Sequence, residues 1–392
     1  MAREENNRFR RELFDEDHEA VRNGFRRFLT KEVQPHYEQW ERDGIIPHAL
    51  FEALGEAGYL CMAVPEAYGG QGLEDFRFSL VLTEECLGLG MTSLASGIAL
   101  VNDVALPYFL DYTNEEQKRR WFPGMVAGKF VTAIAMTEPS GGSDLAALRT
   151  TACLDGDAYV VNGSKTFITN GINADLVLTA VKTDASNRHG GISLLVVERG
   201  MAGFERGRNL EKLGQHSQDT AELFFNDVRV PRSNLIGTEN QGFVHMMTNL
   251  PQERLSIANS AVAASRAALE WTLAYVKERV AFGKPIGTFQ HSRQVLAGIR
   301  TEVEIAQVFI DRCTGLHLKH ELTAEQAAMA KWWCTDLQGR VMDQCLQLFG
   351  GYGYMTEFPI ARAWADARIM RIFGGTNEIM KEIIGKAEGL SG

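Results

Sequence analysis

Leu250-Pro251-Gln252-Glu253-Arg254-Leu255 lies near the start of a long segment with helical periodicity, at roughly residues 243 to 280. Three further segments repeat this period, at about 289 to 319, 323 to 349 and 359 to 384. Glycine and proline separate the segments, as in Gly283-Lys284-Pro285 and Gly350-Gly351-Tyr352-Gly353. Four helices of this length predict a four-helix bundle in the C-terminal part of the chain.

The middle of the chain, from about residue 131 to 230, has the pattern of short strands. Residues 158–161 and 165–168 flank Asn162-Gly163, which tolerates positive φ and predicts a tight hairpin turn. Further short apolar runs lie at 131–136, 174–181, 192–198 and 221–225. Many short strands with turns between them predict a small barrel or sandwich.

The first part of the chain, from residue 14 to about 130, has helical periodicity. Asp15 can cap a helix whose apolar residues Val21, Phe25 and Phe28 recur at helical spacing. The glycine-rich residues 65–72 interrupt this pattern and predict a loop. We therefore expect a mainly α protein with a central β domain. Its N-terminal helical domain would span residues 1–130, a small β-barrel 131–238 and the four-helix bundle 239–392.

The composition is that of an ordinary globular protein of 392 residues, with 23% charged and 45% hydrophobic residues. A net charge of −10 argues against a nucleic-acid binder, although a few local arginines can still hold a phosphorylated ligand. The six cysteines show no Cys-x-x-Cys spacing, so we expect reduced and mostly buried thiols.

No segment predicts a membrane span. The longest uncharged run, residues 86–102, is broken by Gly, Ser and Thr and is shorter than the ~20 apolar residues that a spanning helix needs. Residues 1–6 are acidic and lack an apolar core, which is typical of neither a secretory signal nor a transit peptide. These features predict a cytoplasmic location.

Two motifs in the strand region suit a ligand with a ring and a phosphate. The first is Ala135-Met136-Thr137-Glu138-Pro139-Ser140-Gly141-Gly142-Ser143-Asp144. Its hydroxyls and glycine backbone donors at the end of a strand suit a flavin, but alone a strand followed by a turn explains it equally well. The second, Gly163-Ser164-Lys165-Thr166-Phe167-Ile168-Thr169-Asn170-Gly171, is alone no more than a hairpin strand.

Two further motifs lie in the predicted bundle. In residues 279–290, Arg279 and Gln290 could reach a diphosphate, while a purely structural interpretation makes Gly283-Lys284-Pro285 a helix stop. Near the C-terminus, Gly374 and Gly375 allow the backbone to approach a ligand closely. Asp366 and Arg368 are not spaced as an ion pair on one helix face, so we interpret them as structural.

These separated motifs, in the order helices, β domain and bundle, resemble the acyl-CoA dehydrogenase family over nearly the whole chain. The resemblance implies an FAD enzyme that oxidises a saturated acyl-CoA to the trans-2-enoyl-CoA. It also implies that an electron-transferring flavoprotein accepts the electrons. The usual family state, a homotetramer built as a dimer of dimers, is the expected assembly.

The resemblance also implies where the catalytic base lies. In many members, the position of Gly374 is a glutamate that removes the α-proton of the substrate. In the long-chain and isovaleryl types that carboxylate lies at the position of Glu253. Without the family, Glu253 would be interpreted as a solvated residue on a helix face. With it, we expect Glu253 to be the base, with its proton affinity raised by burial, and the backbone N–H of Gly374 to polarise the carbonyl.

The remaining site residues follow from the same resemblance. Those expected to bind the cofactor are Met136, Thr137, Gly142, Ser143, Phe167, Thr169, Arg279, Phe282, Gln290, Gln347, Gly351, Thr376, Asn377 and Glu378. Those expected to bind the substrate are Ser143, Pro251, Gln252, Arg254, Gly374 and Gly375. The residues of the 279–290 motif, together with Gln347 to Gly351, would contact the FAD of a neighbouring subunit. Two departures stand out: Ser140-Gly141-Gly142 replaces the usual Gly-Ala-Gly, and Phe167 replaces a frequent Trp, which loses the indole donor.

The sequence leaves several functions open. A straight medium or long acyl chain is the first expectation, and a branched short chain of the isovaleryl type is the second. An acyl-CoA oxidase fits less well, because those chains are usually longer. A flavin monooxygenase or nitroalkane-oxidising relative shares this fold, and so would a non-catalytic flavoprotein. The sequence determines neither the pathway nor the electron acceptor.

Overall fold

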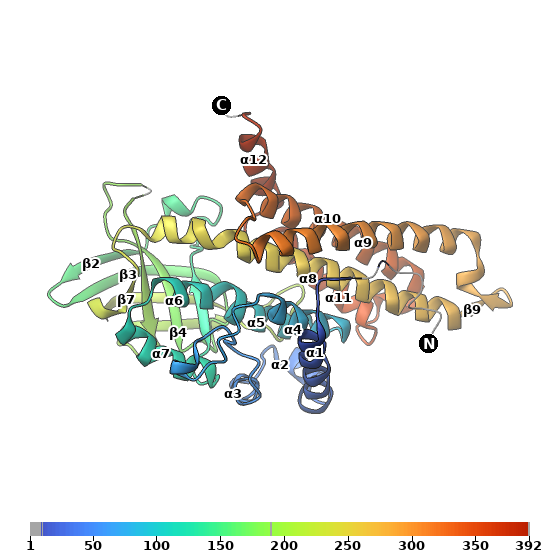
Figure 1. Ribbon diagram of the computed structural model, residues 1–392, viewed down its shortest axis with the longest axis horizontal. Helices are drawn as coiled ribbons and strands as arrows, with labels where there is room; N and C mark the ends of the chain where they lie inside the picture. Colours follow the sequence, from blue (N-terminus) through green and yellow to red (C-terminus); the bar gives the residue numbers. More distant parts are fainter. Residues whose placement is uncertain (1–8, 10, 189, 391–392) are drawn as a thin grey trace.

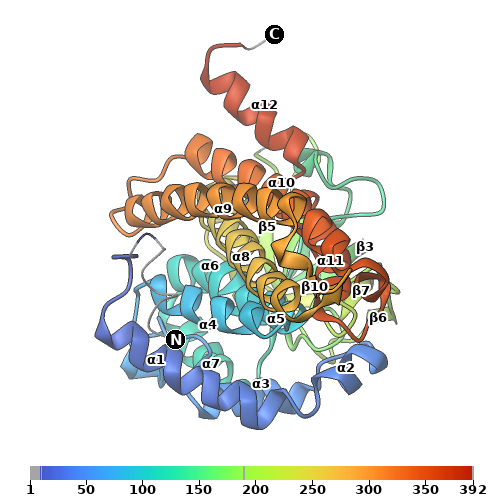
Figure 2. The same cartoon turned by 90° about the vertical axis from the view of Figure 1, so that its right-hand side faces the viewer.

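The computed structural model describes residue 9, residues 11–188 and residues 190–390. Residues 1–6, on which the sequence predicts no targeting signal, lie outside these described residues. The molecule is elongated, with the strands at one end and the long C-terminal helices extending to the other (Figure 1). The N-terminal helices lie along one side of these long helices, below them in the end-on view of Figure 2.

The first N-terminal helix begins where the sequence predicts. Asp15 caps the first helix, and its carboxylate accepts hydrogen bonds from the backbone N–H groups of Asp17 and His18. π-helical stretches Leu29–Val33 and Leu100–Ala105 follow α1 and α5. The helices are α1 (Glu16–Phe28), α2 (Tyr37–Asp43), α3 (His48–Glu56), α4 (Arg77–Gly88), α5 (Thr92–Ala99), α6 (Leu106–Tyr112) and α7 (Glu115–Val126).

The strands of the middle region form one sheet in the order β6-β7-β3-β2-β4-β5-β8, and β1 pairs in parallel with β4. Side chains from β1 to β7 share one apolar core, so the sheet curls around its own interior as a barrel does. The strands are β1 (Thr132–Ala135), β2 (Thr151–Asp155), β3 (Ala158–Thr169), β4 (Leu176–Lys182), β5 (Ile192–Glu198), β6 (Phe204–Asn209), β7 (Thr220–Pro231) and β8 (Leu235–Ile236). The division at residues 130 and 238 stays a prediction.

The hairpin predicted at Asn162-Gly163 is wrong. β3 runs straight through these residues, and its pairing with β7 shifts register between Val161 and Gly163, as at a β-bulge. A Cβ on Gly163 would lie 2.5 Å from Oγ1 of Thr150, so the bulge needs glycine. The hairpin turn lies earlier, between the paired residues Asp155 and Ala158. Tertiary pairing with two neighbouring strands therefore overrides the local turn signal.

Three of the four predicted bundle segments form long helices, α8 (Gly242–Glu278), α9 (Gln290–His317) and α10 (Ala324–Phe349). Between α8 and α9 lies a short hairpin of β9 (Val280–Ala281) and β10 (Lys284–Pro285). The fourth segment, predicted as one helix over 359–384, is wrong because it divides into α11 (Pro359–Ala367) and α12 (Asn377–Ala387). Gly374 and Gly375 between them have φ of 64° and 95°, which no right-handed helix accommodates.

Helix α8 is the central element, because it packs against α9, α10, α4 and the π-helical stretch Leu100–Ala105. Alanines fill much of its buried face, including Ala258, Ala261 and Ala268. Small side chains let neighbouring helices approach closely, which suits a helix surrounded on several sides. The stretch Thr92–Tyr112 is long and apolar enough to cross a membrane, but 67% of its most apolar window is buried. Such burial is typical of a core helix, and the cytoplasmic location stays a prediction.

The cysteines are all free, and five of the six are buried, with Cys153 the exposed one. This agrees with the predicted reduced thiols.

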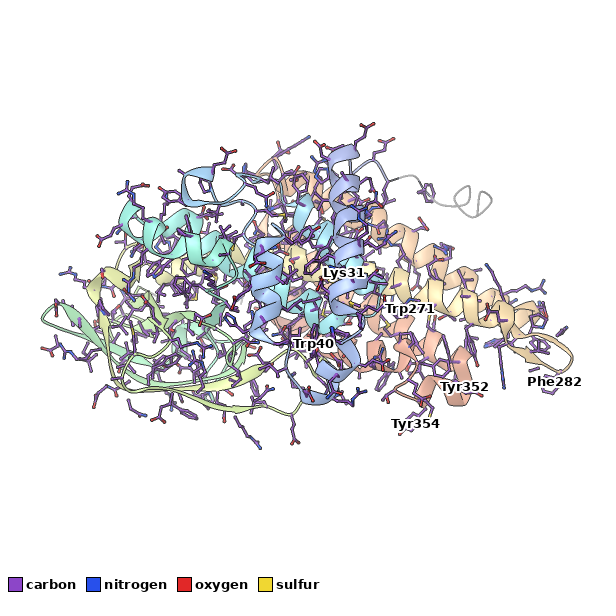
Figure 3. The ribbon with its side chains drawn as sticks, turned by 90° about the horizontal axis from the view of Figure 1, so that it is seen from below. Lys31, Trp40, Trp271, Phe282, Tyr352 and Tyr354 are labelled. Atoms are coloured by element: carbon purple, nitrogen blue, oxygen red, sulfur yellow. The ribbon has the colours of Figure 1, made fainter. Side chains whose placement is uncertain are left out.

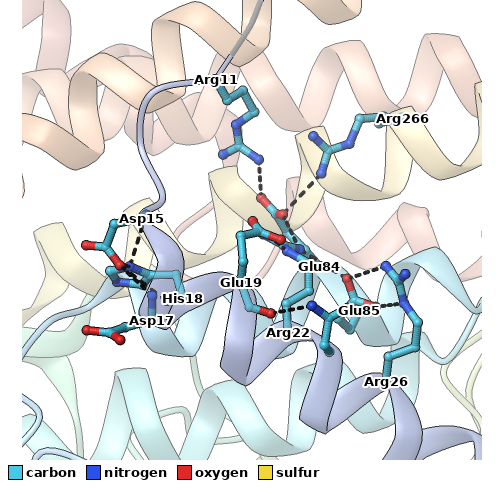
Figure 4. A network of polar contacts seen from close by, with 11 residues as sticks. Arg11, Asp15, Asp17, His18, Glu19, Arg22, Arg26, Glu84, Glu85 and Arg266 are labelled. Atoms are coloured by element: carbon cyan, nitrogen blue, oxygen red, sulfur yellow. Dashed lines mark hydrogen bonds and ion pairs between the residues drawn. The ribbon is translucent and has the colours of Figure 1, made fainter. Parts of the chain in front are cut away.

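A buried charge network fixes the N-terminal segment to the bundle (Figure 4). Glu84 on α4 forms ion pairs with Arg11 at 2.6 Å, Arg22 at 3.0 Å and Arg266 at 3.2 Å. Burial alone would raise the pKa of Glu84, but the charges of the three arginines outweigh it and lower the pKa to about 2. Because Arg266 lies on α8, this single carboxylate joins the first helix, the fourth and the central helix of the bundle.

We expect Glu84→Gln to lower the free energy of unfolding by about 3 kcal/mol at pH 7, because it leaves three arginines around a neutral group. The stabilisation by a carboxylate with a lowered pKa is complete above its unfolded value near 4.5 and is lost as the pH falls toward 2. The difference in the free energy of unfolding between Glu84→Gln and the parent should therefore decrease as the pH falls through that range. Denaturant unfolding curves measure this difference. Glu19→Gln, an exposed partner of Arg22, is the control and should change stability by less than about 1 kcal/mol.

Candidate active site

Glu253 lies inside the protein, in the first half of α8, and is only 7% exposed. Its Oε1 accepts a hydrogen bond of 2.9 Å from the hydroxyl of Tyr108 on α6, which is fully buried. The interpretation of Glu253 as a solvated helix residue is therefore wrong. A carboxylate placed in this way is removed from bulk water while it keeps one defined donor.

The environment of Glu253 suits a general base. Burial raises the pKa of Glu253 to about 7, and the hydrogen bond from Tyr108 and the charge of Arg254 oppose the rise. A pKa near neutrality lets a carboxylate be ionised in part and still hold a proton firmly. Burial, followed by the charge of Glu253 and this hydrogen bond, raises the pKa of Tyr108, so its hydroxyl stays a donor.

The residues 373–376, which we call the glycine loop, lie against the face of α8 that carries Glu253. A Cβ added to Gly374 would meet Cδ1 of Ile257 at 2.4 Å, and Ile257 is one helical turn after Glu253. The Nε of Arg254 donates to the backbone oxygen of Gly374 at 3.4 Å. The structure thus places Glu253, Arg254 and Gly374 in one region of α8 and the glycine loop, and Ile257 occupies the space that a side chain at 374 would need.

The backbone N–H of Gly374 is free to serve a ligand. Over the described ranges, neither a backbone nor a side-chain acceptor bonds it. Gly374 as a residue is partly exposed. A free, oriented N–H beside a buried carboxylate is the arrangement that stabilises charge developing on a carbonyl oxygen.

Thr376, the last residue of the glycine loop, and the two residues that follow it have different surroundings. The hydroxyl of Thr376 caps α12 by accepting from the N–H of Ile379, and Glu378 is exposed. The Asn377 side chain is buried, and its Nδ2 donates to Oγ1 of Thr335 and Oδ1 of Asp336, both at 3.0 Å. The side chain of Asn377 therefore joins α12 to α10, a role that sequence reasoning missed.

The expected substrate residues Pro251 and Gln252 precede the carboxylate on α8. Gln252 Nε2 donates to the backbone oxygen of Asp103 at 2.8 Å. Asp103 lies in the π-helical stretch, and its carboxylate accepts from the hydroxyls of Ser79 and Ser256. Gln252 thus ties α8 to the π-helical stretch that leads into α6 and Tyr108. Such stretches are frequent at functional sites.

The first predicted cofactor motif follows β1, and a buried ion pair supports it. Lys165 Nζ donates to the backbone oxygen of Met136 at 3.1 Å and pairs with Glu138 at 2.9 Å. Burial lowers the pKa of Lys165 to about 8, against the charge of Glu138. Thr137 bonds through its carbonyl to the N–H of Thr166 at 3.0 Å. The second motif is thereby placed directly beside the first.

Phe167 is displayed rather than packed. It has a φ of 59° and is 68% exposed, at a second register shift between Lys165 and Ile168. The bulge turns the Phe167 ring out of the barrel. Phe167 directly follows Thr166, whose N–H donates to the carbonyl of Thr137. An aromatic ring held outward in a strained backbone is explained by a partner that packs on it. In the loop after β1, Gly142 and Ser143 are exposed. Thr169 lies two residues after Phe167 on β3, opposite Thr220.

The second set of predicted cofactor residues lies at the far end of the bundle. A pocket of about 510 Å³ is lined there by Arg279, Gln347 and Gly351, together with Tyr352. Arg279 lies over the ring of Tyr352, with its guanidinium carbon 5.4 Å from the ring centroid. Gln290 and Phe282 lie at the same end but outside the pocket lining, and Phe282, at the hairpin tip, is 95% exposed (Figure 3).

The two sets cannot serve one bound molecule of FAD within one chain. Arg279 follows Glu253 by 26 residues along a continuous helix, which separates them by roughly 39 Å. Figure 1 shows the β domain and the β9 hairpin at opposite ends of the long axis. Residues suited to a ring therefore lie at one end, and a forked cation suited to a diphosphate lies at the other.

Sequence reasoning missed three residues that shape this site: Tyr108, Lys165 and Ile257. Tyr108 and Ile257 stand in no recognisable motif, and Lys165 lies in the second motif without a predicted role, since each acts through a contact made far away in sequence. Asp366 behaves structurally, as expected: it is buried and accepts the N–H of Gln215, while Arg368 is exposed. Among the residues that the structure describes, no group of three or more His, Cys, Asp or Glu side chains could hold a metal ion.

The match to known families extends over the three regions of the chain. Residues 15–129, 133–228 and 240–389 match the family models of the N-terminal, middle and C-terminal domains of acyl-CoA dehydrogenase. These matches define an FAD-dependent oxidoreductase. The exposed ring of Phe167 and the pocket beside Arg279 agree with that class, because they suit the flavin ring and the diphosphate of FAD. The chain belongs to the acyl-CoA dehydrogenase family.

Individual relatives support this assignment. The chain is 45% identical over 378 residues to the mitochondrial long-chain specific acyl-CoA dehydrogenase of Sus scrofa, covering 96% of this chain and 87% of that protein. It is 49% identical to the acyl-CoA dehydrogenase of Geobacillus kaustophilus, whose crystal structure superposes with a TM-score of 0.94 and covers 96% of this chain and 99% of that one. A glutaryl-CoA dehydrogenase from Mycobacterium smegmatis, solved in complex with FADH2, is 28% identical, with a TM-score of 0.88 and coverage of 96% and 95%.

We expect Arg279→Gln to weaken FAD retention by about tenfold, because a neutral amide cannot replace a guanidinium at a diphosphate. The measurement is the ratio of flavin to protein absorbance after gel filtration at increasing dilution. Arg340→Gln removes an exposed arginine of α10 that pairs with Glu302, and it should retain FAD as the parent does. Equal retention by both variants would remove Arg279 from the cofactor site.

Proposed function

We propose that this chain oxidises a straight-chain saturated acyl-CoA of medium or long chain to the trans-2-enoyl-CoA, with Glu253 as the base. The observation that carries the proposal is the buried carboxylate of Glu253, directed by Tyr108 and packed beside a glycine loop with a free N–H. The resemblance to a long-chain enzyme at 45% identity supports the chain-length class.

The chemistry divides between two groups of the chain and the cofactor. The carboxylate of Glu253 takes the proton from the α-carbon, which is only weakly acidic until its neighbouring carbonyl is polarised. The N–H of Gly374 donates to the thioester oxygen as charge develops there. FAD, when bound, accepts the hydrogen of the β-carbon together with its electron pair. One proton and one hydride leave, and a carbon–carbon double bond forms.

The substrate residues have complementary roles. Arg254, next to the base, faces the glycine loop and supplies a cation toward the CoA portion of the substrate. The glycine loop has no side chains at 374 and 375, so the thioester can approach the backbone. Ile257 fills the space above Gly374, which supports the base at 253 over a base at 374.

The cofactor and partner assignments extend the proposal. Met136, Thr137, Gly142, Ser143, Phe167 and Thr169 of one chain would hold the flavin end of FAD. Arg279 and its pocket would hold the diphosphate end of a cofactor bound to a neighbouring subunit, because the two surfaces are too far apart for one chain. A homotetramer then provides complete sites, and an electron-transferring flavoprotein accepts the electrons.

An anaerobic titration with saturated acyl-CoAs of graded length tests the function. Bleaching of the flavin with an optimum at medium or long chains supports the proposal. An optimum at a branched short acyl-CoA would replace it with the isovaleryl type. A flavin that no acyl-CoA reduces would refute the dehydrogenase assignment and favour a non-catalytic or CoA-independent flavoprotein.

We expect Glu253→Gln to keep FAD and to lower the rate of flavin reduction by about 10³-fold, because the amide cannot accept the α-proton. Stopped-flow absorbance under anaerobic conditions measures the rate, with the flavin content checked by denaturation. Glu302→Gln, an exposed glutamate of α9, is the matched control and should react at the parental rate. Parental activity in Glu253→Gln would exclude Glu253 as the base.

The pH dependence tests the contact between Tyr108 and Glu253. Only the ionised carboxylate can take a proton, so kcat/KM should rise with pH through the pKa of Glu253, about 7. Tyr108→Phe removes a donor that stabilises the ionised form, so the midpoint should move upward by about one pH unit. Tyr112→Phe, a neighbour whose ring centroid is 6.4 Å from that of Tyr108, should leave the midpoint in place.

A further inference from the structure

One buried cation has no role in the mechanism described so far. Lys331 on α10 is 0% exposed, and lysine is almost never fully buried without a partner. Its Nζ donates to the backbone oxygen of Gly375 at 2.8 Å and to Oδ1 of Asn377 at 2.9 Å. Both acceptors are neutral, so these contacts do not neutralise its charge, and the buried charge carries a cost of desolvation. A position this costly calls for a function.

Lys331 and Arg254 hold successive carbonyls of the glycine loop. Arg254, from α8, donates to the oxygen of Gly374, and Lys331, from α10, donates to the oxygen of Gly375. Both glycines have positive φ, a conformation in which the backbone has many alternatives. Two donors from different helices therefore select one orientation of two consecutive peptide planes.

Helix α10 fastens the loop at both ends. Asp336 forms an ion pair of 2.6 Å with Arg371, which precedes the loop, and accepts from Asn377, which follows it. Lys331 is bonded between these two anchors, at Gly375 itself. Asp336 and Asn377 thus determine where the loop begins and ends, and Lys331 determines how its central peptides are turned.

We propose that Lys331 is a positioning residue for proton abstraction: by holding the Gly375 carbonyl, it turns the glycine loop so that the N–H of Gly374 faces the thioester oxygen. The inference rests on the proposed function, because it gives the free N–H of Gly374 its purpose. Lys331 itself touches neither the substrate nor the reacting atoms.

The charge of Lys331 adds to this effect. Burial, followed by the charges of Arg254 on α8 and Arg371 before the loop, lowers the pKa of Lys331 to about 7, while Asp336 on α10 and Glu378 on α12 oppose the shift. The ammonium form places a positive charge at the Gly375 carbonyl, on the same loop as the Gly374 N–H that polarises the thioester carbonyl. Above about pH 7 the neutral amine can still donate to the Gly375 carbonyl, so the hydrogen bond is kept when the charge is lost.

The test uses the FAD-loaded enzyme and an acyl-CoA in which sulfur replaces the β-carbon. Its α-proton can be removed, but no β-hydrogen is present to follow, so proton abstraction is isolated. The bound enolate is detected by the long-wavelength charge-transfer absorbance band that it forms with the oxidised flavin. Titration with pH then gives the pKa of the bound ligand, a quantity that a merely structural residue would not change.

We expect Lys331→Met to raise the pKa of the bound ligand by about one unit and to slow flavin reduction by saturating octanoyl-CoA about tenfold, with KM changed less than kcat. Lys331→Gln, which keeps a donor without charge, should lie between Met and the parent. Lys386→Met, at an exposed lysine of α12 that pairs with Glu382, is the matched control and should match the parent.

Two results would overturn the proposal. One is a parental ligand pKa in Lys331→Met. The other, which decides the question if Lys331→Met does not retain FAD, is a parental ligand pKa in Lys331→Gln. Failure of the proposed function itself looks different, because then the parent enzyme is not reduced by octanoyl-CoA and forms no enolate band.

Discussion

Burial of the Glu253 carboxylate is the constraint on which the rest of the site depends. A carboxylate in water is a weak base toward a carbon acid, and removal from water raises its proton affinity. The same burial would leave it unsatisfied without the hydroxyl of Tyr108. Helix α8 must therefore be enclosed on several sides, by α4, α9, α10 and the π-helical stretch, and its alanine-rich face allows this enclosure.

The glycine loop is the counterpart of this buried carboxylate. It presents backbone groups without side chains to the site. Gly374 and Gly375 adopt positive φ, a conformation that other residues rarely accept. Backbone without side chains is flexible, so the surrounding helices must supply order. Arg254, Lys331 and Asp336 do so from two different helices, and the cost of burying cations there is offset by a loop with one defined orientation.

Much of the fold was predictable because its signals are local and repeat. The α1 cap at Asp15, the loop over 65–72 and the bounds of α8, α9 and α10 follow from periodicity, capping and glycine content. The two errors have one cause. Asn162-Gly163 and the segment 359–384 have correct local propensities, but pairing of β3 with two strands and the positive φ of the glycine loop override them.

By itself, the sequence determined the three-part architecture and the family, and it led to the proposal of Glu253 in place of residue 374 as the base, since identity and spacing of residues carry that information. The tertiary structure alone decided that Tyr108 directs the carboxylate, that Ile257 closes the space above Gly374 and that Lys331 holds the glycine loop. These residues lie 145, 117 and 44 positions from Glu253, Gly374 and Gly375, their respective partners. Contacts over such separations form only when the chain folds, so no local pattern records them.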